Sequence, residues 1–202
     1  MTISNVDRIY ETVRRMAADF ELKPDARIKE GEMARKLGVS RTPLREALNR
    51  LVAEGYLTFQ GGHGFFCRSL TPAMVLDLYE ARVAVETEAM RRSVQRASAA
   101  DIDRLTAYLD ETEPEYLRVH DPLRLLELDE AFHSRLCALS GNSEMSRMLE
   151  NLNGRIRYVR MMDLKALREG TAPPSKLLAH RTILEALRDR DAERAEQILR
   201  LH

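Results

Sequence analysis

One stretch decides how the first third of the chain folds, namely GVSRTPLREALNRL at residues 38–51. Gly38 can end a preceding helix in the left-handed conformation, and Ser40 can cap the free amides of a following helix. Pro43 is tolerated in a first helical turn, where its missing N–H is not needed. The apolar residues then recur at the spacing of a helix with one buried stripe, which consists of Leu44, Ala47, Leu48 and Leu51.

The other faces of this helix carry basic and hydrogen-bonding side chains at its N-terminal end, namely Arg41, Thr42 and Arg45. A helix is also predicted at residues 30–37, with Arg35 on its outer side. These two predicted helices and the turn between them are typical of a helix-turn-helix, in which the second helix enters the major groove of DNA. An arginine there can donate two hydrogen bonds to guanine O6 and N7. The alternative is an ordinary helical hairpin with a solvated basic face.

A short hairpin is predicted directly after the second helix. Residues 54–60 end the helix and begin a strand, and Gly61 and Gly62 supply a turn. Residues 64–68 then return as a second strand. The sequence therefore predicts a small wing beside the DNA-reading helix.

The segment LGVSRTPLREAL at residues 37–48, with the glycine-rich wing, resembles the winged helix-turn-helix of the GntR-type bacterial transcription regulators. The resemblance implies that Arg41 and Arg45 contact operator bases and that Thr42 helps to fix the DNA backbone. It also implies that the wing tip near Gly62 approaches the minor groove. The candidate DNA-binding residues are Arg35, Ser40, Arg41, Thr42, Arg45, Gly62 and His63.

Two positions depart from the pattern of this family. Pro24-Asp25 stands where many members have Pro-Gly before the second helix. The wing reads Gly-Gly-His, so that His63 takes the place of the polar residue often found at the tip.

The charge of the chain is unevenly distributed, although its net value is zero. Residues 1–69 hold 12 basic and 9 acidic side chains, whereas residues 70–202 hold 20 basic and 23 acidic ones. The excess is sharpest at residues 27–50, with seven basic against three acidic side chains. A local basic patch can bind phosphate even when the whole protein is neutral.

Composition favours a mostly helical intracellular protein. The chain has 44% apolar and only 5% aromatic residues, which suits one large or two modest helical cores. Two cysteines far apart, Cys67 and Cys137, fit a reduced protein better than a disulfide scaffold. No apolar run approaches the roughly 18–20 residues that span a bilayer, and no secretory core follows the N-terminus. We therefore expect a cytoplasmic protein without a membrane partner.

The chain is expected to contain a winged domain at residues 1–69 and an all-helical domain at residues 70–202. A first helix should pack beneath the helix-turn-helix through Val6, Ile9, Tyr10, Val13 and Ala17. Six helices with short joints predict an antiparallel bundle, at about 72–97, 101–113, 121–140, 143–168, 174–189 and 191–202. The predicted fold class is mainly α, with an N-terminal winged helix-turn-helix and a C-terminal bundle.

Histidines of the bundle indicate a metal site. Asp129 and His133 are one helical turn apart on an apolar face. His180 and His202 also belong to apolar stripes, so that three imidazoles and one carboxylate point inward. Such ligands suit zinc, nickel, iron or manganese, and bundle cores commonly build sites from facing helices. The alternative for each residue is an ordinary hydrogen-bonded core side chain.

The same four residues resemble the metal-binding quartet of the FadR C-terminal domain, which one branch of GntR regulators carries. The matching segments are DEAFH with Asp129 and His133, AHRTILEAL with His180, and the final His202. The resemblance implies a divalent metal in the centre of the bundle, zinc first and nickel, manganese or iron as alternatives. The predicted bundle has six helices rather than seven, and in this it resembles the smaller VanR-like version of the domain.

Arg82, in LYEARVAVE at residues 78–86, matches an arginine that lines the effector pocket in this family. Its guanidinium suits a carboxylate held by two hydrogen bonds, so a small organic acid is the expected effector. The alternative is an ion pair with Glu86, one turn on. Three further arginines are expected to form a charged outer face of the bundle first and to line a pocket only second, namely Arg155, Arg157 and Arg160.

These observations predict a metabolite-responsive transcription regulator, a repressor that senses a small organic acid at its metal site. A homodimer is expected, because two recognition helices related by a twofold axis read a palindromic operator. One alternative is a regulator whose metal is purely structural. The other is a metal-dependent enzyme that uses the Asp/His ligands. No nucleophile motif or phosphate loop supports the enzyme, and the winged domain would be unexplained.

Overall fold

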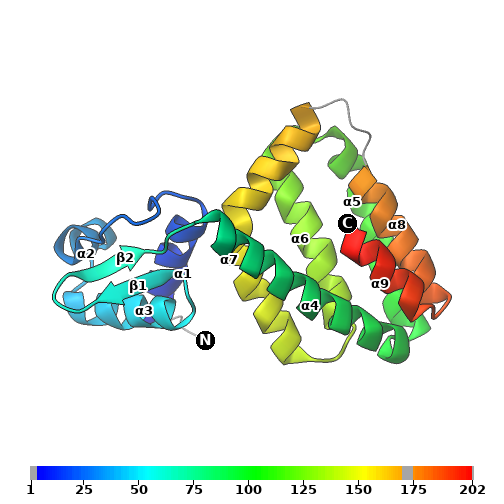
Figure 1. Ribbon diagram of the computed structural model, residues 1–202, viewed down its shortest axis with the longest axis horizontal. Coiled ribbons are helices and arrows are strands. Elements are labelled where there is room, and N and C mark those ends of the chain that lie inside the picture. The colour runs from blue at the N-terminus through cyan, green and yellow to red at the C-terminus, as the bar shows by residue number, and fades with distance from the viewer. Residues whose placement is uncertain (1–3, 170–174, 202) are drawn as a thin grey trace. The chain divides into compact units, whose positions relative to one another are not determined.

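The computed structural model describes residues 4–169 and 175–201, with side chains for 4–166 and 179–200. These residues form two compact units. The first runs to Leu76 and includes Gly154–Tyr158, and the second holds Asp77–Asn153 and the chain from Val159 onward. Helices dominate the described chain, and a two-stranded sheet lies in the first unit (Figure 1). The predicted fold class is confirmed.

Three helices build the first unit: α1 (Asn5–Ala18), α2 (Glu30–Leu37) and α3 (Arg41–Ala53). Gly38 ends α2 with a φ of 65°, the left-handed conformation predicted for it. The predicted stripe of α3 is fully buried, and it packs with α1 and the wing. On α1, Ile9 and Val13 are buried as expected, and Met16 joins them.

The start of α3 differs from the prediction in one detail. Ser40 is the N-cap residue in an extended conformation, but its side chain makes no cap hydrogen bond. Because this end of the helix is exposed, water can satisfy both the hydroxyl and the free amides. The Ser40 hydroxyl therefore remains at the surface instead of closing the helix end.

The wing consists of antiparallel strands β1 (Leu57–Gln60) and β2 (Gly64–Cys67). Their turn is closed by the N–H of His63, which donates to the Gln60 carbonyl at 3.0 Å, with Gly62 at a φ of 75°. A feature missed from the sequence is a third segment beside β2, where Arg27 forms a bridge to Phe66.

Asp25, at the Pro-Asp departure from the family pattern, has a φ of 62°. This is the left-handed region that glycine favours, and aspartate is among the non-glycine residues that enter it most often. Asp25 therefore adopts the backbone conformation for which glycine would be suited.

The second unit is a helical bundle of the predicted order (Figure 1). Its helices among the described residues are α4 (Pro72–Arg96), α5 (Ala99–Arg118), α6 (Pro122–Ala138), α7 (Ser143–Glu169), α8 (Ser175–Arg188) and α9 (Ala192–Leu201). One apolar core draws on all of them, as shown by the buried residues Met90, Leu105, Leu126, Leu164, Ile183 and Leu199. The bundle therefore has the packed interior that a buried polar site requires around it.

The predicted end of the second bundle helix at residue 113 is wrong. α5 continues through Pro114 to Arg118, although proline lacks the N–H of a regular helix. The extra turn buries Tyr116 in the bundle core, and the Val119 N–H closes the helix on the Glu115 carbonyl at 2.8 Å. Burial of an aromatic side chain thus outweighs one lost backbone hydrogen bond.

Candidate metal centre and DNA-reading face

Asp129 and His133 lie on the buried face of α6. Their spacing of four residues places them one turn apart, and they are 1% and 2% exposed. Buried charged or polar groups are expensive unless another polar group or an ion contacts them. This face of α6 therefore carries polar chemistry within an apolar surrounding that includes Phe132 and Leu136.

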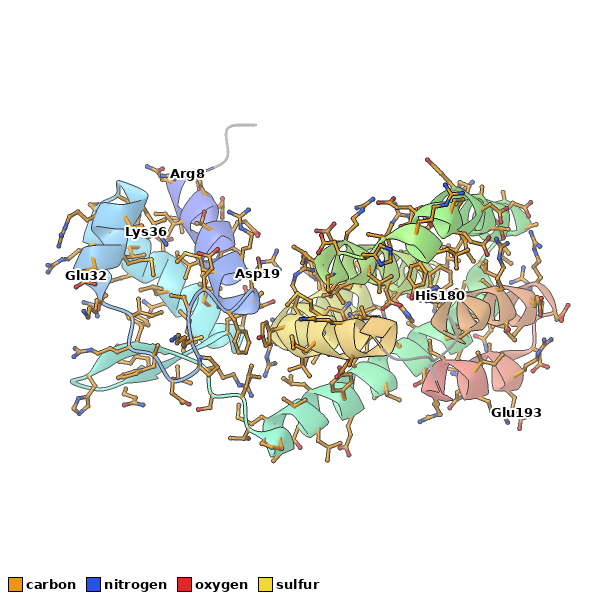
Figure 2. All side chains as sticks on the ribbon, turned by 90° about the horizontal axis from the view of Figure 1, so that it is seen from above. Arg8, Asp19, Glu32, Lys36, His180 and Glu193 are labelled. Atoms are coloured by element: carbon orange, nitrogen blue, oxygen red, sulfur yellow. The ribbon has the colours of Figure 1, made fainter. Side chains whose placement is uncertain are left out.

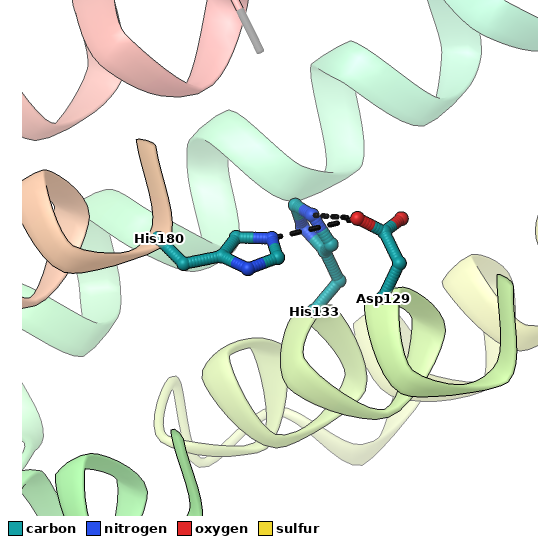
Figure 3. Close-up of side chains that lie close together, drawn as sticks. All are labelled: Asp129, His133 and His180. Carbon is teal, nitrogen blue, oxygen red and sulfur yellow. Dashed lines mark ion pairs between the residues drawn. The ribbon is translucent and has the colours of Figure 1, made fainter. Parts of the chain in front are cut away.

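His180 reaches the same place from α8, which packs against α5 and α9 (Figure 2). Its imidazole stacks on Phe132 with ring centroids 4.1 Å apart, and it meets Tyr116 edge-on at 6.1 Å. Two aromatic neighbours on different helices restrict rotation of the imidazole. The side chain is thus held with one nitrogen directed at Asp129 (Figure 3).

The three side chains form a compact cluster (Figure 3). Oδ1 of Asp129 lies 3.5 Å from Nε2 of His180 and 4.0 Å from Nε2 of His133. One ligand atom from each residue lies within 4.8 Å of the others. Atoms bound tetrahedrally at about 2.0–2.2 Å to one zinc ion lie about 3.3–3.6 Å apart. The Asp129–His180 pair already has this spacing, and the Asp129–His133 pair is slightly wider. His202, the fourth predicted ligand, lies outside the described residues.

The donor set fits a divalent transition metal. Two imidazoles and one carboxylate are ligands that zinc accepts, and they also suit nickel, iron and manganese. Oxygen-only sites for calcium or magnesium use no imidazole. The described chain therefore contains a possible Asp/His metal triad in the bundle core.

Arg160 contacts the other side of Asp129, which sequence reasoning did not foresee. Its Nη2 donates to Asp129 Oδ2, and its Nη1 lies 3.1 Å from Glu130 and 3.3 Å from Asn153. Arg160 is 5% exposed, so its prediction as part of a charged outer face is wrong. Its three contacts satisfy a buried guanidinium and orient the carboxylate of Asp129 toward the histidines.

Arg82 is buried on α4, and Glu86 lies between it and His133 of the triad. Its Nη2 donates to Oε1 of Glu86 at 3.0 Å, which is the ion pair considered as the alternative for this residue. The Nε of Arg82 is also buried and has no hydrogen-bond partner among the described residues. Arg82 thus combines an internal ion pair with a donor that another acceptor can use.

Glu86 also approaches the triad. Its Oε1 lies 3.0 Å from Nδ1 of His133. Burial acts to raise the pKa of Glu86, but the neighbouring side chains of His133 and Arg82 outweigh it and hold the pKa at about 2. Glu86 is therefore ionised, and the same oxygen faces an arginine and a histidine.

The predicted DNA-binding residues lie on the surface of the first unit. All seven are exposed: Arg35, Ser40, Arg41, Thr42, Arg45, Gly62 and His63. Glu32 and Lys36 on α2 also point outward (Figure 2). The structure therefore presents the basic end of α3 and the wing tip to solvent, while the apolar stripe of α3 holds the helix in place.

Arg45 has a partner that sequence reasoning missed. Its Nε lies 3.5 Å from Oε2 of Glu30, and the Arg45 side chain remains 55% exposed. Ion pairs at the surface contribute only about 0–1 kcal/mol, so this contact holds the Arg45 side chain only weakly. No local sequence signal links Arg45 to Glu30, because they belong to different helices.

No helix within the described residues combines the length and the apolar character that crossing a membrane requires.

Two protein families match this chain. Residues 5–67 match the bacterial regulatory proteins of the gntR family, and residues 77–202 match the FCD domain. The Nta operon transcriptional regulator of Aminobacter aminovorans is 42% identical over 154 residues, which are 76% of this chain and 72% of that protein. The transcriptional repressor RspR of Escherichia coli K12 is 26% identical over 198 residues, and the match covers 96% of this chain and 84% of RspR.

Solved structures share the fold along nearly the whole chain. Escherichia coli McbR/YncC superposes with a TM-score of 0.70 at 21% identity, covering 99% of this chain and 93% of that one. A GntR-family regulator from Pseudomonas syringae pv. tomato DC3000 has a TM-score of 0.54 at 27% identity, covering 98% and 80%. These families and relatives are transcriptional regulators, not enzymes. The chain therefore belongs to the GntR family of DNA-binding transcriptional regulators, with a C-terminal FCD domain.

Proposed function

We propose that this regulator represses transcription as a homodimer and releases its operator when a small organic acid binds at a metal site in the bundle. The observation that carries the proposal is the buried cluster of Asp129, His133 and His180 beside Arg82. A repressor role is supported by the relatives RspR and GlaR, whose names call them repressors. Residues 1–69 would act as the DNA-binding domain and residues 70–202 as the sensing domain.

Asp129, His133 and His180 would hold the ion, with zinc as the first choice and nickel, manganese or iron as alternatives. His202 is the candidate for a fourth ligand. A bound divalent ion would act as a Lewis acid that attracts the carboxylate of the effector. Arg160 keeps the Asp129 carboxylate oriented, and the stack on Phe132 keeps the His180 ring oriented.

Arg82 is the candidate for binding the acid. Its buried guanidinium is planar and has a spare Nε donor, and charge-assisted hydrogen bonds to a carboxylate are stronger than neutral ones. The ligand must be small, because Arg82 lies in the packed bundle at 8% exposure. These features support a compact organic acid over a large or apolar effector.

DNA recognition would use the exposed end of α3. Arg41 and Arg45 would contact base edges, Arg35, Ser40 and Thr42 would contact the backbone, and the wing tip at Gly62 and His63 would approach the minor groove. One recognition helix reads only a few base pairs, so two copies related by twofold symmetry would read a palindrome. We place this action in the cytoplasm, where bacterial operator DNA is found.

An effector shifts an equilibrium only by its different affinity for the two states. The acid must therefore bind the operator-free arrangement more tightly than the operator-bound one. The main alternative is a regulator whose metal is purely structural, since a buried Asp/His site also stabilises a fold.

Titration of organic acids into the zinc-loaded protein tests the proposal. The operator is first selected from random duplexes with the wild-type protein, and its release is followed by fluorescence anisotropy. Release by one class of acid supports the sensor. Zinc binding without any response to acids would support the structural metal instead.

A further inference from the structure

Glu86 joins two parts of the site that have separate roles in the proposed function. Its Oε1 lies 3.0 Å from Nη2 of Arg82 and also 3.0 Å from Nδ1 of His133. One oxygen thus serves the candidate acid-binding arginine and a candidate metal ligand. All three side chains are at least nine-tenths buried, so water screens their interaction only weakly.

The position of Glu86 determines which nitrogen of His133 is available to a metal. Nε2 is the nitrogen that faces Asp129, at 4.0 Å, whereas Nδ1 lies 3.0 Å from Oε1 of Glu86 without the alignment of a regular hydrogen bond, which a small rotation of the ring would supply. A carboxylate at Nδ1 favours the tautomer with its proton on Nδ1, which leaves the Nε2 lone pair for the ion. Carboxylates that accept from the outer nitrogen of a metal-bound histidine also raise its basicity as a ligand.

We propose that Glu86 is a positioning residue of the metal site and that it couples this site to Arg82. The inference rests on the proposed function, because it requires that the triad binds a metal. Glu86 holds His133 in the tautomer that can bind the ion. Arg82 contacts the same oxygen and so reduces the negative charge that faces His133.

Because Arg82 and His133 face the same oxygen of Glu86, the direction of the coupling between acid binding and metal binding can be predicted. An acid that draws Arg82 away from Glu86 leaves more negative charge beside Nδ1 of His133. His133 then becomes a stronger ligand, so acid binding tightens metal binding. By thermodynamic linkage, the metal must tighten acid binding by the same factor.

The two halves of the ion pair give opposite predictions for zinc affinity. Glu86→Gln removes the charge at Nδ1 and should weaken zinc binding about 10- to 100-fold. Arg82→Gln leaves the full charge of Glu86 facing His133 and should bind zinc at least as tightly as the wild type. Both variants break the same buried ion pair, so a general loss of stability would weaken both alike.

The measurement is competition for Zn²⁺ between a chromogenic chelator and the full chain, with no acid present. Glu88→Gln is the matched control, because Glu88 lies on the same helix, is 33% exposed and pairs with Arg91 and Arg92. It should leave zinc affinity unchanged. The double variant Arg82→Gln/Glu86→Gln leaves no unpaired buried charge, so it should fold even if Glu86→Gln alone folds poorly. Its zinc affinity should be about 10- to 100-fold below that of the wild type, as expected for Glu86→Gln.

The outcomes separate this inference from the proposed function. If wild-type protein binds zinc and Glu86→Gln binds it equally well, the positioning role of Glu86 is wrong and the metal site stands. A parallel loss of affinity in Glu86→Gln and Arg82→Gln would also overturn the coupling. If the wild-type protein binds no zinc, the metal site itself is wrong, and the inference falls with it.

Discussion

Nε2 of His180 lies 3.5 Å from Oδ1 of Asp129, although the two residues belong to different helices, α8 and α6. Each is 1% exposed. An apolar pair at these positions would fill the core without any need for polar partners. The contact therefore marks a polar cluster inside an apolar core, which is where we propose that the metal binds.

His133→Ala should abolish zinc binding, because it removes one of the clustered ligand atoms. Wild-type protein purified without chelator should carry zinc, and free zinc at 100 times its dissociation constant should raise the free energy of unfolding by about 2.7 kcal/mol. Metal analysis and thermal unfolding with and without chelator measure both effects. His120→Ala, which changes an exposed histidine, is the control and should behave like the wild type.

Full zinc content in His133→Ala would place the ion elsewhere in the chain. A loss of zinc in both His133→Ala and His120→Ala would point to general damage instead of a specific site.

Arg45→Ala should weaken operator binding by about 1–3 kcal/mol and relax base preference at one position of each half-site. The change removes the proposed base contact from α3 while leaving the buried stripe of this helix intact. Anisotropy titrations at fixed salt on the selected operator and its single-base variants measure both effects. Arg147→Ala, which changes an exposed arginine of α7, is the control. Unchanged operator affinity and base preference in Arg45→Ala would show that Arg45 does not contact the operator bases.

Arg82→Lys should impair the response to acid while sparing DNA binding. Lysine keeps a positive charge beside Glu86 but cannot offer two parallel donors to a carboxylate. We expect the concentration of acid that releases half of the operator to rise about tenfold or more, which is a loss of about 1.4 kcal/mol. Arg118→Lys, an exposed change on α5, is the matched control. An unaltered acid response in Arg82→Lys would assign acid binding to other residues.

Pro114→Ala should stabilise the bundle. Pro114 is exposed and lies inside α5, where alanine restores a backbone N–H without disturbing a core contact. The gain in the free energy of unfolding should be about 1–3 kcal/mol, somewhat reduced because proline also restricts the unfolded chain. Urea unfolding measures it. Leu117→Ala in the same turn, an exposed change, should stay within about 0.5 kcal/mol, and a less stable Pro114→Ala would contradict the explanation of α5.

Local patterns in the sequence predicted much of this architecture. The apolar spacing of Leu44, Ala47, Leu48 and Leu51 defines the buried face of α3, and Gly38 ends α2 in the left-handed conformation. The spacing of Asp129 and His133 likewise placed both on one buried face. Each of these features depends on residues within two helical turns, which the sequence displays directly.

Features that depend on packing between helices were not predicted. Pro114 predicts a helix end, and only the burial of Tyr116 explains why α5 continues. Arg160 has the sequence context of a surface arginine, but α7 turns it toward Asp129. Glu86 was considered only as a neighbour of Arg82, because its contact with His133 joins α4 to α6.

Diffraction from crystals equilibrated with zinc, recorded on both sides of the zinc absorption edge, locates the ion that we propose. We expect one strong anomalous peak per chain, in contact with the carboxylate of Asp129 and the imidazoles of His133 and His180. A peak bound only to other side chains, or no peak at this position in zinc-equilibrated crystals, would contradict the assignment of these three residues as metal ligands.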